Sequence, residues 1–148
     1  MDMLNDQLLI KELTSEAEWE KAFPVMKQLR TQLNLDTYLT LVSESVKKED
    51  YRLIALYNQN EIVALCGFMP MITLYNGKFI WVCELITDSK HRSKGYGKVL
   101  LNYVHEWAVA NDYPIVSLSS GLQRIDAHRF YEEKMEYDKV SYVYLKKI

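Results

Sequence analysis

The stretch FIWVCELITDSKHRSKGYGKVLL, residues 79–101, decides the fold, because it joins a strand-like run to a glycine-containing loop and a helix. Residues 79–86 are almost entirely apolar, which is typical of a strand covered on both faces. From Lys98 to Asn111 the apolar residues recur at helical spacing. Gly95 and Gly97 lie between the two elements and allow backbone conformations that side chains block. Because N–H groups at a helix start point along its axis, this order predicts an anion site.

The charges of the loop indicate which anion it binds. Arg92, Lys94 and Lys98 surround the two glycines, so we expect a phosphate or a pyrophosphate. A Walker A loop does not fit, because Arg92 stands where its first glycine belongs and Val99 follows the lysine. A dinucleotide fingerprint does not fit either, because Leu100 occupies the place of its third glycine. What is left is the pattern R-x-x-G-x-G after a strand that ends in E-L-I-T-D.

This pattern resembles the pyrophosphate-binding loop of the GNAT superfamily, the acyl-CoA-dependent N-acetyltransferases. A second segment, AHRFYEEKMEY at residues 127–137, resembles the A-x-x-F-Y-x-x-x-G-F element of the same family. The resemblance covers nearly the whole chain, although the first 50 residues match only in their coarse helix pattern. Three positions in and beside these motifs depart from the family: Ser89 stands where it often has proline, and Ser93 and Glu136 stand where it often has glycine. The change at Glu136 implies a different helix exit.

The hydrophobic periodicity predicts an α/β (α+β) fold in the order β-α-α-β-β-β-α-β-α-β, with a mixed, mostly antiparallel sheet flanked by helices. Ser15 or Thr14 caps the first helix in this prediction and Asp36 the second. Gly67 and Pro70 suggest a bulge or bend. The expected strands are 8–13, 52–57, 61–74, 78–87, 115–119 and 140–146, and the expected helices are 14–33, 36–46, 98–111 and 126–135.

Length and composition set the broad class of the protein. The 148 residues contain no repeat or linker, so we expect one acetyltransferase domain over 1–148. A net charge of −2 argues against general nucleic-acid binding. Cys66 and Cys83 both sit in apolar runs, which argues against a disulfide scaffold and favours a reducing cytoplasm. With no basic leader and no apolar run of about 20 residues, neither secretion nor a membrane partner is expected.

The resemblance implies acetyl-CoA as co-substrate and names the residues that contact it. The pyrophosphate would be held mostly by backbone N–H groups of Arg92, Ser93, Lys94, Gly95, Tyr96, Gly97 and Lys98. The pantetheine arm would pair with the backbone of Leu85, Ile86 and Thr87, near a splayed bulge of that strand. Arg124 stands where many members carry an asparagine that helps to hold the pantetheine. No pair of histidines or cysteines has metal-ligand spacing, so we expect no metal.

Three residues carry the expected chemistry. Glu84 is the candidate general base, because a carboxylate inside an apolar strand is otherwise costly to bury. The backbone N–H of Leu85 would polarise the thioester carbonyl. Tyr131 matches the family tyrosine that protonates the departing thiolate, which its ordinary pKa of ~10 allows. More ordinary roles stay open for two of them: Glu84 could face solvent or pair with a cation on a neighbouring strand, and Tyr131 could be a core aromatic.

The expected reaction is direct transfer of an acetyl group to a primary amine, most simply of a small molecule. The acidic stretch 12–20 would suit a cationic acceptor, although such charge is usually a solvated helix face. Within enzymes, the alternative is a protein acetyltransferase for lysine or N-terminal amines. Outside them, the alternatives are a non-catalytic acyl-CoA-binding module and a nucleotide-binding protein. Many relatives pair through sheet edges or helices, so a homodimer is a further expectation.

Overall fold

The computed structural model describes residues 2–3 and 8–148. The chain divides into two compact units, with the boundary along the sequence between Ser117 and Leu118. In chain order the elements of the first unit are β1 (Asp2–Met3), β2 (Leu8–Leu13), α1 (Glu16–Leu29), α2 (Leu35–Glu49), β3 (Arg52–Asn58), β4 (Glu61–Thr73), β5 (Gly77–Thr87), the 3-10 turn η1 (Ser89–His91) and α3 (Tyr96–Ala110). Strand β6 (Val116–Leu118) crosses the boundary. The second unit holds α4 (Ile125–Arg129) and the π-helical turn η2 (Phe130–Lys134).

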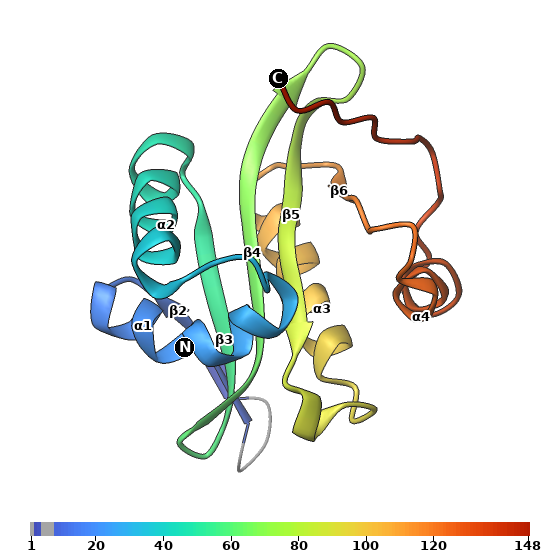
Figure 1. Ribbon diagram of the computed structural model, residues 1–148. Coiled ribbons are helices and arrows are strands. Elements are labelled where there is room, and N and C mark those ends of the chain that lie inside the picture. Colours follow the sequence, from blue (N-terminus) through green and yellow to red (C-terminus); the bar gives the residue numbers. More distant parts are fainter. Residues whose placement is uncertain (1, 4–7) are drawn as a thin grey trace. The chain divides into compact units, whose positions relative to one another are not determined.

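The sheet runs in the order β1-β2-β3-β4-β5-β6, and every neighbouring pair from β1 to β5 is antiparallel. After the crossover through α3, the chain returns beside β5, where the Ile80 N–H donates to the Ile115 carbonyl at 2.9 Å. Figure 1 shows β4 and β5 as the longest strands, with α3 behind them. The predicted α+β class with a mixed, mostly antiparallel sheet is confirmed.

The first two helices begin at side-chain caps. Ser15, one of the two predicted caps, is the N-cap of α1, and with Glu18 it forms a reciprocal capping box that was not predicted. The prediction that Asp36 caps α2 is wrong, because Asn34 is the cap and its Oδ1 accepts from the Thr37 N–H at 2.8 Å. Asn34 has the extended backbone that a cap needs. Asp36 lies in the first turn, where its carboxylate favours the positive end of the helix dipole.

Alternating strand residues build a core on each face of the sheet. Leu53 and Ala55 of β3 belong to the cluster that packs under α1 and α2. Ile54 is also fully buried but has the opposite parity, so it points to the other face. On that face Phe68 meets Trp107 of α3 edge-on, with ring centroids 5.2 Å apart. Burial on both faces explains why residues 79–86 show no polar alternation.

Strand β5 carries a bulge at Cys83. Gly67 of β4 pairs with Glu84, and the next residue of β4, Phe68, pairs with Val82, so Cys83 is the extra residue. The expected bulge is therefore confirmed opposite Gly67, whereas Pro70 keeps a regular partner. A bulge of this kind re-aims the side chains beside it, and here the neighbouring side chain is that of Glu84.

The second unit differs from the sequence prediction at two places. The expected single helix over 126–135 is an α-helical turn followed by the π-helical η2. The predicted strand over 140–146 is wrong, because these residues are exposed and form no strand. Alternation shows which side chains could share a buried face, but a strand also needs a partner backbone, which only the tertiary fold supplies. The assignment of 1–148 to one domain stays a prediction.

Candidate functional site

The loop before α3 forms an open helix N-terminus. Gly95 is the N-cap residue, with a φ of 80°, and no side chain caps the helix. The N–H groups of the first turn therefore point outward without a side-chain acceptor, which is the arrangement of an anion site. Arg92, Lys94 and Lys98 are all exposed around it. The chain thus offers backbone donors and positive charge at one place.

Two positions that depart from the sequence motif keep the backbone that glycine favours. Ser93 has a φ of 65° and Glu136 has a φ of 60°, so both lie in the left-handed region. Glycine adopts this region without a steric penalty, which gives a physical reason for glycine at these places in the motif. Ser93 and Glu136 therefore adopt this conformation although neither is glycine. The different helix exit expected at Glu136 stays a prediction.

A side chain of α1 braces the entry to the loop. The Gln28 amide donates to Asp88 Oδ1 at 2.9 Å, and its Oε1 accepts from the Ser89 N–H at 2.9 Å. The hydrogen bond from Gln28 is the main reason why the pKa of Asp88 is lowered.

His91 lies close to two carboxylates: its Nε2 is 3.2 Å from Glu61 Oε1 and 4.0 Å from Asp88 Oδ2. Among the described residues, Glu61, Asp88 and His91 are the one group whose donor atoms are close enough to hold a metal ion.

The carboxylate of Glu84 is held from two sides at the bulge. Tyr51, between α2 and β3, donates its hydroxyl to Glu84 Oε1 at 2.6 Å. Arg30, which ends α1, places Nη2 3.5 Å from Oε2 and donates from the same atom to the Cys83 carbonyl at 2.7 Å. Only 18% of the Glu84 side chain is exposed. The arginine thus contacts both the bulge residue and the carboxylate that follows it.

Burial and the two partners act on the Glu84 carboxyl in opposite directions. Burial raises its pKa above the ordinary value, while the Tyr51 hydroxyl and the Arg30 guanidinium oppose the rise. Burial also raises the pKa of Tyr51, which keeps the phenol protonated as a donor. Of the two ordinary roles considered for Glu84, full exposure is wrong. The ion pair exists, but its cation comes from the end of α1 and not from a neighbouring strand.

Gly67 leaves the space in which Tyr51 and Glu84 meet. A Cβ at this position would overlap the Tyr51 hydroxyl and the Glu84 Oε1. The φ of Gly67 does not lie in the left-handed region, so glycine is not required here for its backbone conformation. It is required because a side chain would not fit. Sequence reasoning missed Tyr51 and Arg30. The available signal was a glycine inside an otherwise apolar strand, which marks a close approach.

The predicted pantetheine contacts follow directly after the bulge. Leu85, Ile86 and Thr87 pair on one side with Cys66, Leu65 and Ala64 of β4. Ile86 is buried, while Leu85 and Thr87 are partly exposed. Their role toward acetyl-CoA stays a prediction.

Tyr131 and Arg124 belong to the second unit. Tyr131 lies in η2, is 8% exposed, and packs its ring 5.4 Å from that of Phe130 and 6.0 Å from that of Tyr137. π-Helical turns of this kind are frequent at functional sites. Arg124 precedes α4, and its N–H donates to the Gly121 carbonyl at 3.0 Å. The roles of both residues in catalysis and cofactor binding stay predictions.

Two residues of the acidic stretch 12–20 are already paired within the fold. Glu12 lies 2.9 Å from Arg52, and Glu18 lies 2.6 Å from Lys11. Glu18 also accepts hydrogen bonds at the start of α1, and with Lys11 these lower its pKa to about 2. The stretch therefore offers less free negative charge to a cationic acceptor than its composition suggests.

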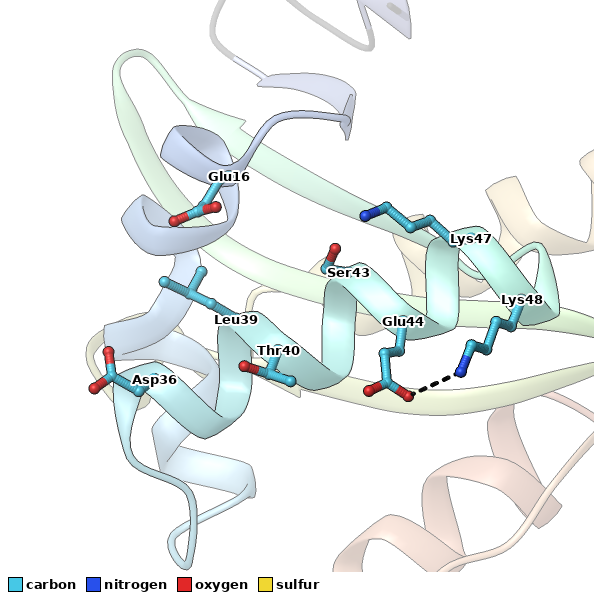
Figure 2. A pocket seen from close by; sticks show the side chains of 8 residues that line it. All are labelled: Glu16, Asp36, Leu39, Thr40, Ser43, Glu44, Lys47 and Lys48. Carbon is cyan, nitrogen blue, oxygen red and sulfur yellow. Dashed lines mark ion pairs between the residues drawn. The ribbon is translucent and has the colours of Figure 1, made fainter.

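A groove of about 460 Å³ lies on the outer side of α2. Figure 2 shows its polar lining, which includes the ion pair between Glu44 and Lys48 at 3.6 Å. Its lining residues are Glu16, Asp36, Leu39, Thr40, Ser43, Glu44, Lys47 and Lys48. None of the predicted site residues lines it. In the described part of the chain, no helix combines the length and apolar character needed to span a membrane.

Comparisons with known proteins show the family and the fold of the chain. The family model described as acetyltransferase (GNAT) matches residues 12–137. A Bacillus subtilis (strain 168) protein, the uncharacterized N-acetyltransferase YhdJ, is 47% identical over 139 residues, which cover 94% of this chain and 98% of that protein. Among solved structures, aminoglycoside N-acetyltransferase AAC(6')-Iy in complex with CoA superposes with a TM-score of 0.84 at 11% identity, covering 99% of this chain and 98% of that one. A transcriptional regulator from Bacillus halodurans C-125 gives a TM-score of 0.81 at 26% identity, covering 95% and 99%.

Proposed function

The chain belongs to the acetyltransferase (GNAT) family and is an N-acetyltransferase, and from this premise we propose that it transfers an acetyl group from acetyl-CoA directly to a primary amine of a small molecule. The observation that carries the proposal is the Glu84 carboxylate, held by Tyr51 and Arg30 beside the bulge of β5. We also propose that both units act as one domain, because the matched residues run across their boundary.

The loop before α3 fits the pyrophosphate of acetyl-CoA. The first turn of α3 has no side-chain cap, and a Cβ at Gly95 would meet nothing within 4 Å, so the space next to the donors is open. The proposed contacts to the pyrophosphate are Arg92, Ser93, Lys94, Gly95, Tyr96, Gly97 and Lys98, and those to the pantetheine are Leu85, Ile86, Thr87 and Arg124. Bound acetyl-CoA supplies the thioester carbonyl that the amine attacks.

Glu84 is the proposed general base. An alkyl amine with a pKa of ~10.4 is neutral in only about one molecule in 2,500 at pH 7, so removal of a proton is needed before attack. A carboxylate whose pKa is raised toward neutrality accepts that proton more readily than an exposed one. Because the side chain is largely buried, an unhindered primary amine is the kind of acceptor that reaches it. The Leu85 N–H is the proposed donor to the carbonyl oxygen.

Tyr131 is the proposed acid for the departing thiolate. Tyr131→Phe is expected to lower kcat about 10²-fold, because a positioned acid typically contributes at least that factor. The Kd of acetyl-CoA should change little, since the ring and its packing are retained. Steady-state kinetics together with a cofactor titration measure both quantities. An unchanged kcat would remove Tyr131 from the mechanism and leave it as a core aromatic.

Acetyl-CoA is expected to stabilise the protein, whereas ATP and NAD are not. With a Kd of ~10 µM, a concentration of ~1 mM adds about 2.7 kcal/mol to the free energy of unfolding. For a chain of this size, Tm should rise by roughly 5–11 °C. Thermal unfolding with each ligand measures the effect. An equal shift with ATP would favour a nucleotide-binding protein and contradict the loop assignment.

Release of free thiol from acetyl-CoA, screened over acceptors, tests the rest of the proposal. Small-molecule primary amines, lysine peptides and peptides with free N-termini form the three arms. Turnover confined to the first arm supports a small-molecule acceptor, and turnover confined to the peptides supports a protein acetyltransferase. Cofactor binding without turnover in any arm would point to an acyl-CoA-binding module and contradict the proposed reaction.

A further inference from the structure

Tyr51 and Arg30 surround Glu84, and we propose that they are positioning residues which leave Oε2 as the oxygen that accepts the proton of the amine. The proposal rests on the proposed function, in which Glu84 is the general base. It assigns a role to two residues that are distant in sequence from every motif of the chain.

Oε1 of Glu84 is already occupied by a hydrogen-bond donor. The Tyr51 hydroxyl donates to it at 2.6 Å, a length typical of a strong hydrogen bond to an ionised acceptor. The side of Oε1 that faces β4 is closed as well, because it lies against Gly67. An oxygen bound this tightly in a buried place is a poor acceptor for a further proton from outside.

Oε2 of Glu84 has an ion-pair partner but no short hydrogen bond from any residue that the structure describes. Arg30 Nη2 is 3.5 Å away, which is an ion-pair distance but too long for a good hydrogen bond. The hydrogen bond of the same atom goes to the Cys83 carbonyl, at 2.7 Å. The guanidinium is therefore anchored to the bulge. It supplies positive charge beside Oε2 while leaving the lone pairs of this oxygen available.

The surroundings of the Glu84 carboxylate hold it in this arrangement. Tyr51 is buried and belongs to the core cluster under α1 and α2, so its hydroxyl has one fixed position. Gly67 provides the room in which hydroxyl and carboxylate meet. The extra residue at Cys83 turns Glu84 out of the regular pleat of β5. The Tyr51 hydroxyl, the space at Gly67 and the bulge at Cys83 together fix the position of the Glu84 carboxylate.

Apart from Arg30, the titratable groups that interact with Glu84 are neutral at pH 7. Tyr38 of α2, Cys66 of β4 and Cys83 of β5 all interact electrostatically with it, and the pKa of each is raised, chiefly by burial. Arg30 is then the charged group that faces the carboxylate. In the proton step, one N–H proton of the ammonium form of the acceptor moves to Oε2, the nitrogen of the resulting neutral amine keeps the electron pair for attack, and the proton later passes to water.

The test is the pH dependence of kcat/KM in Tyr51→Phe. Loss of the hydroxyl removes a group that favours the ionised carboxylate, so the acidic limb should move to higher pH by about one pH unit. Arg30→Gln should move the limb in the same direction, and Arg30→Lys, which keeps the charge, should move it less. The KM for acetyl-CoA should stay the same in all three variants.

Tyr38→Phe is the matched control. Tyr38 is also buried, but its hydroxyl donates to the Trp19 carbonyl at 2.7 Å and not to Glu84. This variant should lose stability without moving the acidic limb. A direct reading comes from carbon-13 NMR titration of the Glu84 carboxyl, which does not depend on turnover.

The outcomes distinguish the positioning role of Tyr51 and Arg30 from the role of Glu84 as general base. If Glu84→Gln removes the acidic limb and neither Tyr51→Phe nor Arg30→Gln moves it, the positioning role is wrong and the base assignment stands. If Glu84→Gln leaves the limb in place, the base assignment itself is wrong. Should Tyr51→Phe fail to fold, the Arg30 variants test the same prediction.

Discussion

Glu84→Gln is expected to lower kcat by about 10²–10⁴-fold, because it removes the proposed general base while keeping the shape of the side chain. The amide can still accept the Tyr51 hydrogen bond through its oxygen, and Arg30 keeps its bond to the Cys83 carbonyl. The Kd of acetyl-CoA should therefore stay close to that of the parent chain. Initial rates against amine concentration, together with a cofactor titration, measure the two effects.

The stability of Glu84→Gln serves as its internal control. Burial raises the pKa of Glu84 above the value in the unfolded chain, so the folded state binds the proton more tightly. The contribution of this group to stability is thus largest below pH 4.5, and it is lost as pH rises through the folded pKa. At pH 7 the neutral amide should leave Tm unchanged or raise it. A large fall in Tm together with the loss of activity would contradict a specific catalytic role.

Gly67→Ala is expected to damage both stability and activity. Its Cβ would overlap the Tyr51 hydroxyl and the Glu84 carboxylate, and overpacking of this kind costs about 1–3 kcal/mol. Tm should fall by roughly 2–12 °C. The displaced carboxylate should also lower kcat by about 10²-fold, because small misplacements of a catalytic group have effects of that size. Thermal unfolding and steady-state kinetics check the two parts.

Two further variants make this test specific. In Gly67→Ala combined with Tyr51→Phe, the hydroxyl, which is the nearest overlapping atom, is gone, while the ring carbon Cζ and Glu84 Oε1 remain close. The added methyl group should therefore cost less than it does alone, but not nothing. Gly121→Ala is the control, since the atoms nearest to its Cβ would belong to the side-chain end of Gln123, which can move away. If the stability losses of Gly67→Ala and Tyr51→Phe simply add in the double variant, Gly67 is not required for room around Glu84. An equal loss of stability in Gly121→Ala would lead to the same conclusion.

Several parts of the site could be predicted from the sequence because they depend on neighbouring residues. The R-x-x-G-x-G loop needs a strand before it and a helix after it, and residues 79–101 contain all three. Glu84 could be singled out because a carboxylate in an apolar strand is unusual. The bulge was indicated by Gly67, although the extra residue lies on the partner strand.

The partners of Glu84 could not be found in this way. Tyr51 lies 33 positions before Glu84 and occupies an ordinary place between a helix and a strand. Arg30 is one of many basic residues at a helix end. Nothing local distinguishes either residue, because their roles come from the packing of α1 against β5 and from the pairing of β4 with both β3 and β5.

The sequence by itself determined the order of the elements from residue 8 to residue 118, the open start of α3 and the candidate base, since these follow from local periodicity and backbone preferences. The cap of α2 is local as well, since Asn34 accepts from Thr37 three residues on, although the sequence prediction chose Asp36. Only the tertiary structure decided that residues 140–146 form no strand and that a tyrosine and an arginine hold Glu84. The physical reason is the distance along the chain over which each interaction acts. Hydrophobic pattern and capping act over a few residues, whereas strand pairing and the partners of a buried charge depend on segments that meet only when the chain folds.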